Sequence, residues 1–146
     1  MTDTTLPSEA KITLQAYGNS LPQLFENTAH ELFKILINPE DIGEALREKV
    51  VIEAVHAEGL LHEWVNALLR LATDQHILYK KSRFQVFEVE RTGSGKLRAE
   101  VTGELVDPVR HTFRKEPRHW ICERVELLNN SKTIEAKIFL SSGPPK

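Results

Sequence analysis

The sequence predicts an α+β fold in which a mostly antiparallel six-stranded sheet packs on two helices, giving a two-layer sandwich. Two segments have the apolar spacing of amphipathic helices and six have strand patterns, four of them in two consecutive hairpins. Because two helices cannot cover both faces of a six-stranded sheet, one sheet with the helices on one face is the economical arrangement. The 146 residues are expected to form a single domain, 1–146, with flexible tails at 1–9 and 142–146.

The first half of the chain alternates strands with helices. Residues 12–17 alternate apolar and polar side chains, as in a strand, and Gly18 ends it. Ser20 and Gln23 have the spacing of a capping box, which predicts a helix over 21–36 that ends before Asn38-Pro39.

A second strand is expected over 49–57, followed by a second helix. The apolar face of this helix consists of Leu60, Leu61, Trp64, Val65, Leu68, Leu69 and Ala72. Its solvent face is expected to carry His62, Glu63, Asn66 and Arg70.

The second half of the chain reads as two hairpins. Strands over 84–91 and 96–104 flank Gly93-Ser94-Gly95, and strands over 118–128 and 132–140 flank Asn129-Asn130-Ser131.

Composition and charge exclude several classes of protein. The chain has 19 Lys and Arg against 21 Asp and Glu, a net charge of -2, so it does not bind nucleic acid by bulk charge, although a local basic patch stays possible. No apolar run approaches the roughly 18 residues of a membrane helix, and residues 1–9 do not resemble a secretory signal. The single cysteine, Cys122, indicates a reducing, cytoplasmic location, and we expect a buried thiol rather than a nucleophile.

The familiar catalytic motifs are incomplete. His62-Glu63 begins the metalloprotease pattern His-Glu-x-x-His, but Asn66 stands where the second histidine is required. There is no Gly-x-Ser-x-Gly elbow and no phosphate-binding loop, and Gly93-Ser94-Gly95 lies between strands rather than before a helix.

The loop after the fourth strand is the first local feature that points to a function. It brings Glu104, Asp107, Arg110 and His111 together, and loops carry a large share of functional groups. On these residues alone, a solvated turn in which Asp107 caps its own backbone is the favoured interpretation.

The second local feature that points to a function is a basic segment, residues 110–119. Its members are Arg110, His111, Arg114, Lys115, Arg118 and His119. With Trp120 beside it for stacking, the segment could contact RNA phosphates, or it could contact an acidic partner protein. A charged, solvated edge that prevents aggregation is favoured over both, since the chain as a whole is slightly negative.

Several words of the sequence, taken in order, resemble the archease family over about residues 10 to 141. The matching words are Ala16-Tyr17-Gly18-Asn19-Ser20-Leu21, Leu24-Phe25-Glu26-Asn27 with Ala29 and Leu32-Phe33, Leu60-Leu61-His62-Glu63-Trp64-Val65-Asn66-Ala67-Leu68-Leu69, Leu97-Arg98-Ala99, Gly103-Glu104, Asp107 and Arg110-His111.

The resemblance implies a chaperone-like protein that assists the tRNA-splicing RNA ligase by promoting its guanylylation and multiple turnover, without being an enzyme itself. We therefore expect a cytoplasmic, non-catalytic accessory protein without a cofactor, whose partner is an RNA ligase or RNA. The candidate partner-binding residues are Glu104, Asp107, Arg110, His111, Arg114 and Arg118.

Two alternatives stay open. One is an RNA-binding or protein-interaction module that uses residues 110–119. The other, ranked last, is a metal-dependent hydrolase, which needs acids where Lys11 and Ser141 now stand or a cluster of Glu104, Asp107 and His111.

The resemblance also implies a divalent-cation site, and the chain departs from the family there. Lys11 and Ser141 stand where the family has its two aspartate ligands, and Glu123 stands where it has a histidine. A hard dication requires anionic oxygen ligands, and an ammonium would repel it. We predict that the usual site is degenerate and binds no metal, with Lys11 pairing with Glu9, Asp107 or Glu123.

Overall fold

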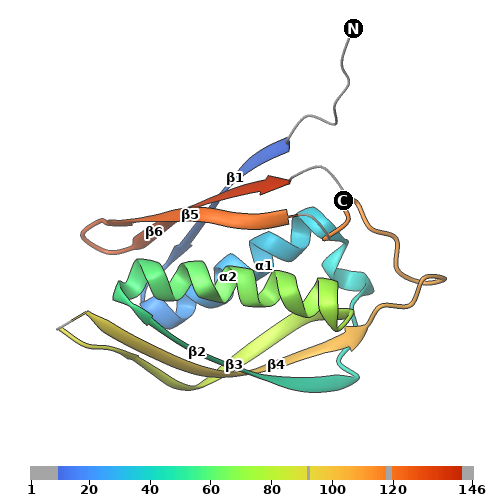
Figure 1. Cartoon of the computed structure of the whole chain (residues 1–146), viewed down its shortest axis with the longest axis horizontal. Helices are drawn as coiled ribbons and strands as arrows, with labels where there is room; N and C mark the ends of the chain where they lie inside the picture. The colour runs from blue at the N-terminus through green and yellow to red at the C-terminus, as the bar shows by residue number, and fades with distance from the viewer. Residues whose placement is uncertain (1–9, 92, 118–119, 143–146) are drawn as a thin grey trace, which may run out of the picture.

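The fold places two helices between two three-stranded sheets (Figure 1). A computed structural model describes residues 10–91, 93–117 and 120–142. The elements in chain order are β1 (Ala10–Gly18), α1 (Leu21–Leu36), the 3-10 turn η2 (Pro39–Asp41), β2 (Leu46–Val55), α2 (His56–Asp74), β3 (Ile77–Val89), β4 (Ser94–Leu105), β5 (Trp120–Asn129) and β6 (Ile134–Ser142).

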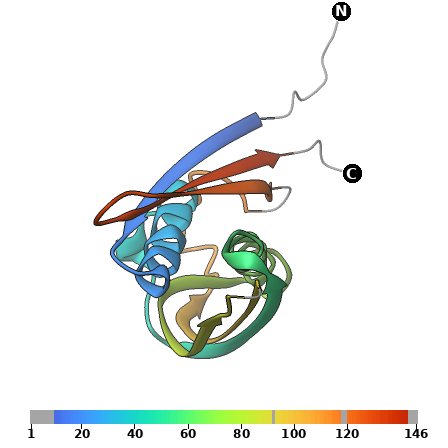
Figure 2. The same cartoon turned by 90° about the vertical axis from the view of Figure 1, so that its left-hand side faces the viewer.

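The α+β class, the two helices and the antiparallel strands confirm the prediction, but the strands form two sheets rather than one sheet of six. The strand orders are β1-β6-β5 and β2-β4-β3, and all neighbours are antiparallel. Both helices contact both sheets. Two helices in a middle layer cover one face of each sheet, so the arrangement satisfies the same burial requirement with three layers instead of two. Figure 2 shows that the sheet β2-β4-β3 curves with its concave side toward the helices.

Helix α1 has the predicted bounds because its signals are local. The Ser20 side chain accepts a hydrogen bond from the Gln23 N–H at 3.3 Å, and the Gln23 side chain accepts one from the Asn19 N–H at 2.5 Å. The buried face consists of Leu24, Phe25, Thr28, Ala29, Leu32, Phe33 and Leu36.

Helix α2 begins earlier than the apolar spacing predicts. Strand β2 ends at Val55 and the helix follows at once, because His56 adopts a left-handed backbone conformation with φ 66° that reverses the chain. The His56 N–H donates to the Gly93 carbonyl at the turn between β3 and β4. The expected apolar residues of α2 are all buried, together with Leu71.

Strand β3 begins at Ile77, seven residues before the strand expected over 84–91. Its pairing with β4 shifts register between Tyr79 and Lys81 and again between Phe84 and Val86. Each shift adds one residue to β3 only, and the extra residue interrupts the alternation of buried and exposed side chains. Because the alternation is interrupted, the sequence pattern does not predict the first half of the strand.

Of the two expected tails, residues 1–9 and 143–146 lie outside the described part of the chain. Ser142, the first residue of the expected C-terminal tail, ends β6 and pairs with Ala10. Among the helices described, none is long and apolar enough to span a membrane.

Candidate functional site

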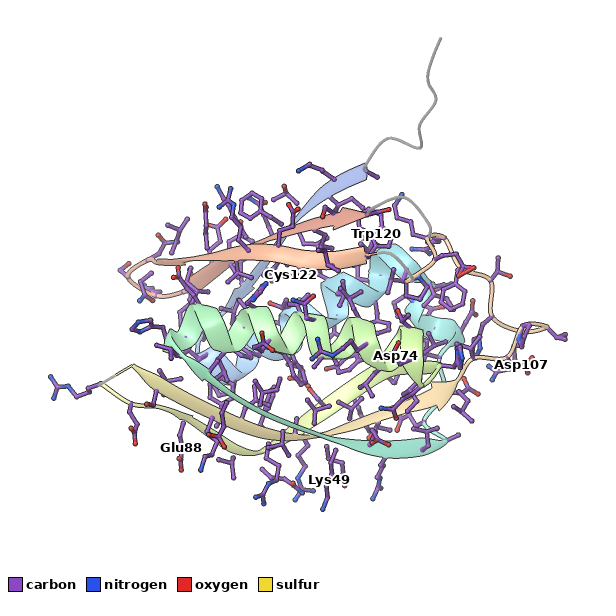
Figure 3. The ribbon with its side chains drawn as sticks, viewed as in Figure 1. Lys49, Asp74, Glu88, Asp107, Trp120 and Cys122 are labelled. Carbon is purple, nitrogen blue, oxygen red and sulfur yellow. The ribbon has the colours of Figure 1, made fainter. Side chains whose placement is uncertain are left out.

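The loop after β4 folds back onto the segment that follows η2 and forms a network of hydrogen bonds around Glu104. The Glu104 Oε1 atom accepts the Gly43 N–H at 2.7 Å and lies 3.0 Å from His111 Nε2. The other carboxylate oxygen accepts a hydrogen bond from the Arg110 guanidinium. This network attaches the loop to the end of the sheet, and Figure 3 shows Asp107 in the loop that extends from this end.

His111 holds the loop from inside. Its side chain is fully buried. The Asp107 N–H donates to Nδ1 at 2.8 Å, which fixes the proton on Nε2. Nε2 then donates to Glu104 Oε1 and to the Asp41 carbonyl, both at 3.0 Å.

The pKa of the Glu104 carboxyl lies below its ordinary value. The main cause is the hydrogen bond from the Gly43 N–H, with further contributions from the hydrogen bond and positive charge of Arg110 and from the hydrogen bond of His111. Each of these contacts favours the ionised form, so Glu104 stays a carboxylate that organises the loop.

The remaining candidate residues have different surroundings. The Asp107 side chain accepts the Val109 N–H at 3.0 Å, as the capped-turn interpretation predicts, and lies 4.0 Å from the Arg110 Nε. The Arg114 side chain donates to the Lys34 carbonyl at 2.8 Å, beyond this network. Arg118 lies outside the described residues, as does His119. The structure thus brings together Glu104, Asp107, Arg110 and His111 and separates Arg114 from them.

A second cluster lies at the paired ends of β1 and β6. Lys11 and Ser141 are direct partners across the two strands. The Lys11 Nζ atom lies 3.7 Å from Glu123 Oε1, so Glu123 is the partner among the three suggested acids. Glu9 is not among the described residues, and the Asp107 side chain lies within reach of Arg110 in the other cluster.

These residues do not fit a divalent cation. Glu123 supplies a single carboxylate, and the Lys11 ammonium lies 3.7 Å from it. Across the part of the chain that the structure describes, no group of three or more His, Cys, Asp or Glu side chains is placed to hold a metal ion. That includes the Glu104, Asp107 and His111 set that the hydrolase alternative requires.

The contact between α2 and β5 differs from the sequence prediction. His62 and Asn66, expected on the solvent face of α2, are partly buried against the edge strand β5. The Asn66 amide accepts the Cys122 N–H at 2.9 Å and donates to the Cys122 carbonyl at 3.2 Å, and His62 Nε2 lies 2.7 Å from the same carbonyl. One side chain thus satisfies both backbone groups of an edge residue, a role that no pattern along a single helix reveals.

Cys122 itself is buried, as predicted. Burial raises the pKa of its thiol to about 12, so the thiolate needed for nucleophilic attack is scarce at neutral pH. Asp74, Trp120 and Cys122, labelled in Figure 3, are among the residues that line an open cavity of about 430 Å³ between β5 and α2.

Fold and site together define a small α+β protein in which Glu104, Asp107, Arg110 and His111 form one network of hydrogen bonds and ion pairs. The model of the Archease protein family (MTH1598/TM1083) matches residues 4–140. The chain belongs to the archease family. This membership supports an accessory role in RNA processing.

Individual relatives agree with this assignment. The chain is 32% identical to protein archease of Methanosarcina acetivorans over 137 residues and 30% identical to that of Methanosarcina mazei over 136, with 92% of each chain covered in both cases. The solution structure of Methanobacterium thermoautotrophicum protein 1598 has a TM-score of 0.68 and 23% identity, and the match covers 90% of this chain and 91% of that one. At that identity the solved structure supports the fold alone.

Proposed function

We propose that this chain is a non-catalytic accessory protein that assists an RNA ligase in tRNA splicing or RNA repair. The observation that carries the proposal is the family match over residues 4–140. The match includes both helices, the loop after β4 and all of β6 except its last two residues. The hydrogen bonds of Glu104 and His111 also support a structural role for these two side chains in ordering the loop, because their polar groups are engaged within the chain.

The loop after β4 is the surface that we assign to the ligase. His111 and Glu104 hold the loop in one conformation, so little conformational entropy remains to be lost when a partner binds. At its tip the Val109 side chain is 95% exposed, and Leu105 at its base is 55% exposed. Apolar groups on a rigid loop, next to the charges of Asp107 and Arg110, are suited to a protein partner.

The proposed role does not use a divalent cation at Lys11 and Ser141. Support comes from the ion pair between Lys11 and Glu123, which places an ammonium where the family resemblance implies a cation ligand. A protonated amine in this position supplies a positive charge next to Glu123 and leaves a dication no site.

The alternative RNA-binding role of residues 110–119 has less support. Both Arg110 and Arg114 donate hydrogen bonds within the chain, which reduces their availability to phosphates. RNA binding that disappears on combining Arg114→Glu with Arg118→Glu would favour this alternative.

The test begins with the tagged chain, purified together with its partners, and continues with ligation assays. We expect an RNA ligase to co-purify and the chain to increase the number of ligation events per ligase molecule. Val109→Asp places a charge at the loop tip, where the side chain is exposed, and is expected to reduce the stimulation about ten-fold, as removal of an interface anchor does. Val55→Asp, at an exposed position at the end of β2, is the matched control.

Stimulation that is equal for Val109→Asp and the unchanged chain would exclude the loop as the ligase surface. A ligase whose turnover does not respond to the chain would overturn the proposed function.

A further inference from the structure

The solvent-facing side of the sheet β2-β4-β3 is divided into a basic and an acidic zone. The basic band, as we call it, consists of the exposed residues Arg47, Lys49, Lys81, Arg83 and Arg98. Figure 3 shows Lys49 and Glu88 pointing away from the helices on this side of the sheet.

The strand register places the five cations next to one another. Arg47 and Lys81 are both paired with Thr102 of the central strand, and Lys49 and Arg83 are both paired with Glu100. Arg98 lies two residues before Glu100 on the same face of β4. Neighbouring strands are about 4.8 Å apart and successive positions on one face about 7 Å apart, so the band is a compact patch.

Most of this positive charge is not neutralised within the chain. Lys81 forms an ion pair with Glu44 at 3.0 Å. Among the described residues, Arg47, Lys49, Arg83 and Arg98 have no ion pair and no side-chain hydrogen bond. Glu100 is the single acid inside the band. A chain with a net charge of -2 therefore concentrates cations on one patch.

An acidic zone limits the band on one side. Lys96 lies two residues before Arg98 on the same face of β4, and it is paired with Glu53 on one side and with Glu88 on the other. A polyanion on this sheet is therefore directed toward the end where β4 enters the Glu104 and Arg110 network.

The side chains of the band distinguish among possible occupants. Phe84 and Phe87, the aromatic residues at the centre of β3, pack inward on Trp64 and Phe25, so the described outer face has no stacking platform for single-stranded bases. The face also lacks the apolar centre of a typical protein interface, since its strongly exposed apolar side chains are Val51, beside Arg98, and Val55, at the far end of β2 beside Ser94. Cations without aromatic or apolar anchors match a regular array of phosphates.

We propose that the basic band binds the phosphate backbone of double-helical RNA without regard to sequence. This goes beyond assistance to a ligase, because it requires the chain itself to contact RNA. It also differs from the role considered for residues 110–119, which lie in another part of the fold.

The test measures binding of a fluorescently labelled RNA hairpin with a stem of about 16 base pairs, the length that shape-reading duplex binders span. Fluorescence anisotropy at low and rising salt is compared for the unchanged chain and for Lys49→Glu combined with Arg83→Glu and Arg98→Glu. We expect the triple variant to bind at least about ten-fold more weakly. The slope of log affinity against log salt is expected to fall by about one for each phosphate that the variant no longer neutralises.

A second triple variant, Arg91→Glu with Lys132→Glu and Lys137→Glu, makes the same change in net charge outside the band and is expected to keep most of the affinity. Circular dichroism establishes that all proteins are folded. The proposal is overturned if the hairpin does not bind at low salt, if both triple variants are weakened equally, or if polyglutamate competes as well as an unlabelled hairpin, which would indicate an acidic protein instead.

Discussion

Lys11 and Ser141 face each other as direct partners on β1 and β6, and the Lys11 ammonium lies 3.7 Å from the Glu123 carboxylate. Cross-strand partners share one face of a sheet and lie about 5 Å apart at their Cβ atoms. The two substitutions that the sequence places far apart in the chain therefore belong to one location. The charge there is an ammonium paired with a carboxylate, where a dication would require several anionic oxygens.

His111 is expected to be the most important side chain for the order of the loop. His111→Leu removes one of the three donors to Glu104, which keeps those of Gly43 and Arg110, and it leaves the partly buried Asp107 N–H without its acceptor. We expect the free energy of unfolding to fall by about 1–3 kcal/mol, measured by chemical denaturation.

Val109→Ala, in the same loop, changes an almost fully exposed side chain and is expected to shift stability by less than about 0.5 kcal/mol. Equal stability of the His111→Leu variant and the unchanged protein would show that the network does not order the loop.

Glu104 predicts a pH dependence of stability. Its folded-state pKa lies below the ordinary value of 4.5, so its contribution to stability is fully present above that pH and is lost as pH falls through the folded-state pKa. The difference in unfolding free energy between the unchanged protein and Glu104→Gln is therefore expected to shrink as pH falls below 4.5. Chemical denaturation of both proteins at pH values above and below 4.5 measures this difference. A difference in unfolding free energy that does not change with pH would contradict the assigned contacts of Glu104.

Two glycine-to-alanine substitutions are expected to act in opposite directions. A Cβ at Gly103 would lie 1.8 Å from the Leu78 carbonyl oxygen, so Gly103→Ala must separate β3 from β4 and is expected to cost about 3 kcal/mol. A Cβ at Gly59 in α2 would meet only Ala54 at an ordinary 3.6 Å, so Gly59→Ala is expected to stabilise by up to about 1 kcal/mol. Denaturation midpoints that move in the same direction would contradict this packing.

Cys122 is expected to resist alkylation. Its thiol is buried, and its pKa is raised to about 12, so iodoacetamide at neutral pH should label the unfolded chain quickly and the folded chain slowly. Mass spectrometry with and without denaturant measures both rates. Rapid labelling of the folded chain would show that the Asn66 contact opens readily.

The features that local signals determine were predictable from the sequence. The Ser20 cap, the apolar spacing and the Asn38-Pro39 stop define α1 within the chain itself. The same holds for the buried residues of α2 and for the capped turn at Asp107, because each depends on residues a few positions apart.

The remaining features depend on contacts between distant residues. The division into two sheets depends on where the helices pack, and the first half of β3 is not predictable from the pattern because its bulges interrupt the alternation. The contact of Asn66 with Cys122 joins residues 56 positions apart. The pattern of α2 alone therefore does not predict that β5 packs over the Asn66 side chain. The basic band has the same origin, since three strands contribute to it.

Titration with Ca²⁺ by calorimetry tests most directly the claim that Lys11 takes the place of the cation. We expect no binding to the unchanged chain. Lys11→Asp combined with Ser141→Asp adds two carboxylates beside Glu123 and is expected to create a site with a Kd of about 10⁻³ M or tighter, whereas the same pair changed to Asn, of equal size and no charge, should bind far more weakly. Tight binding of Ca²⁺ by the unchanged chain that is abolished by substitutions at residues 11 and 141 would contradict the account.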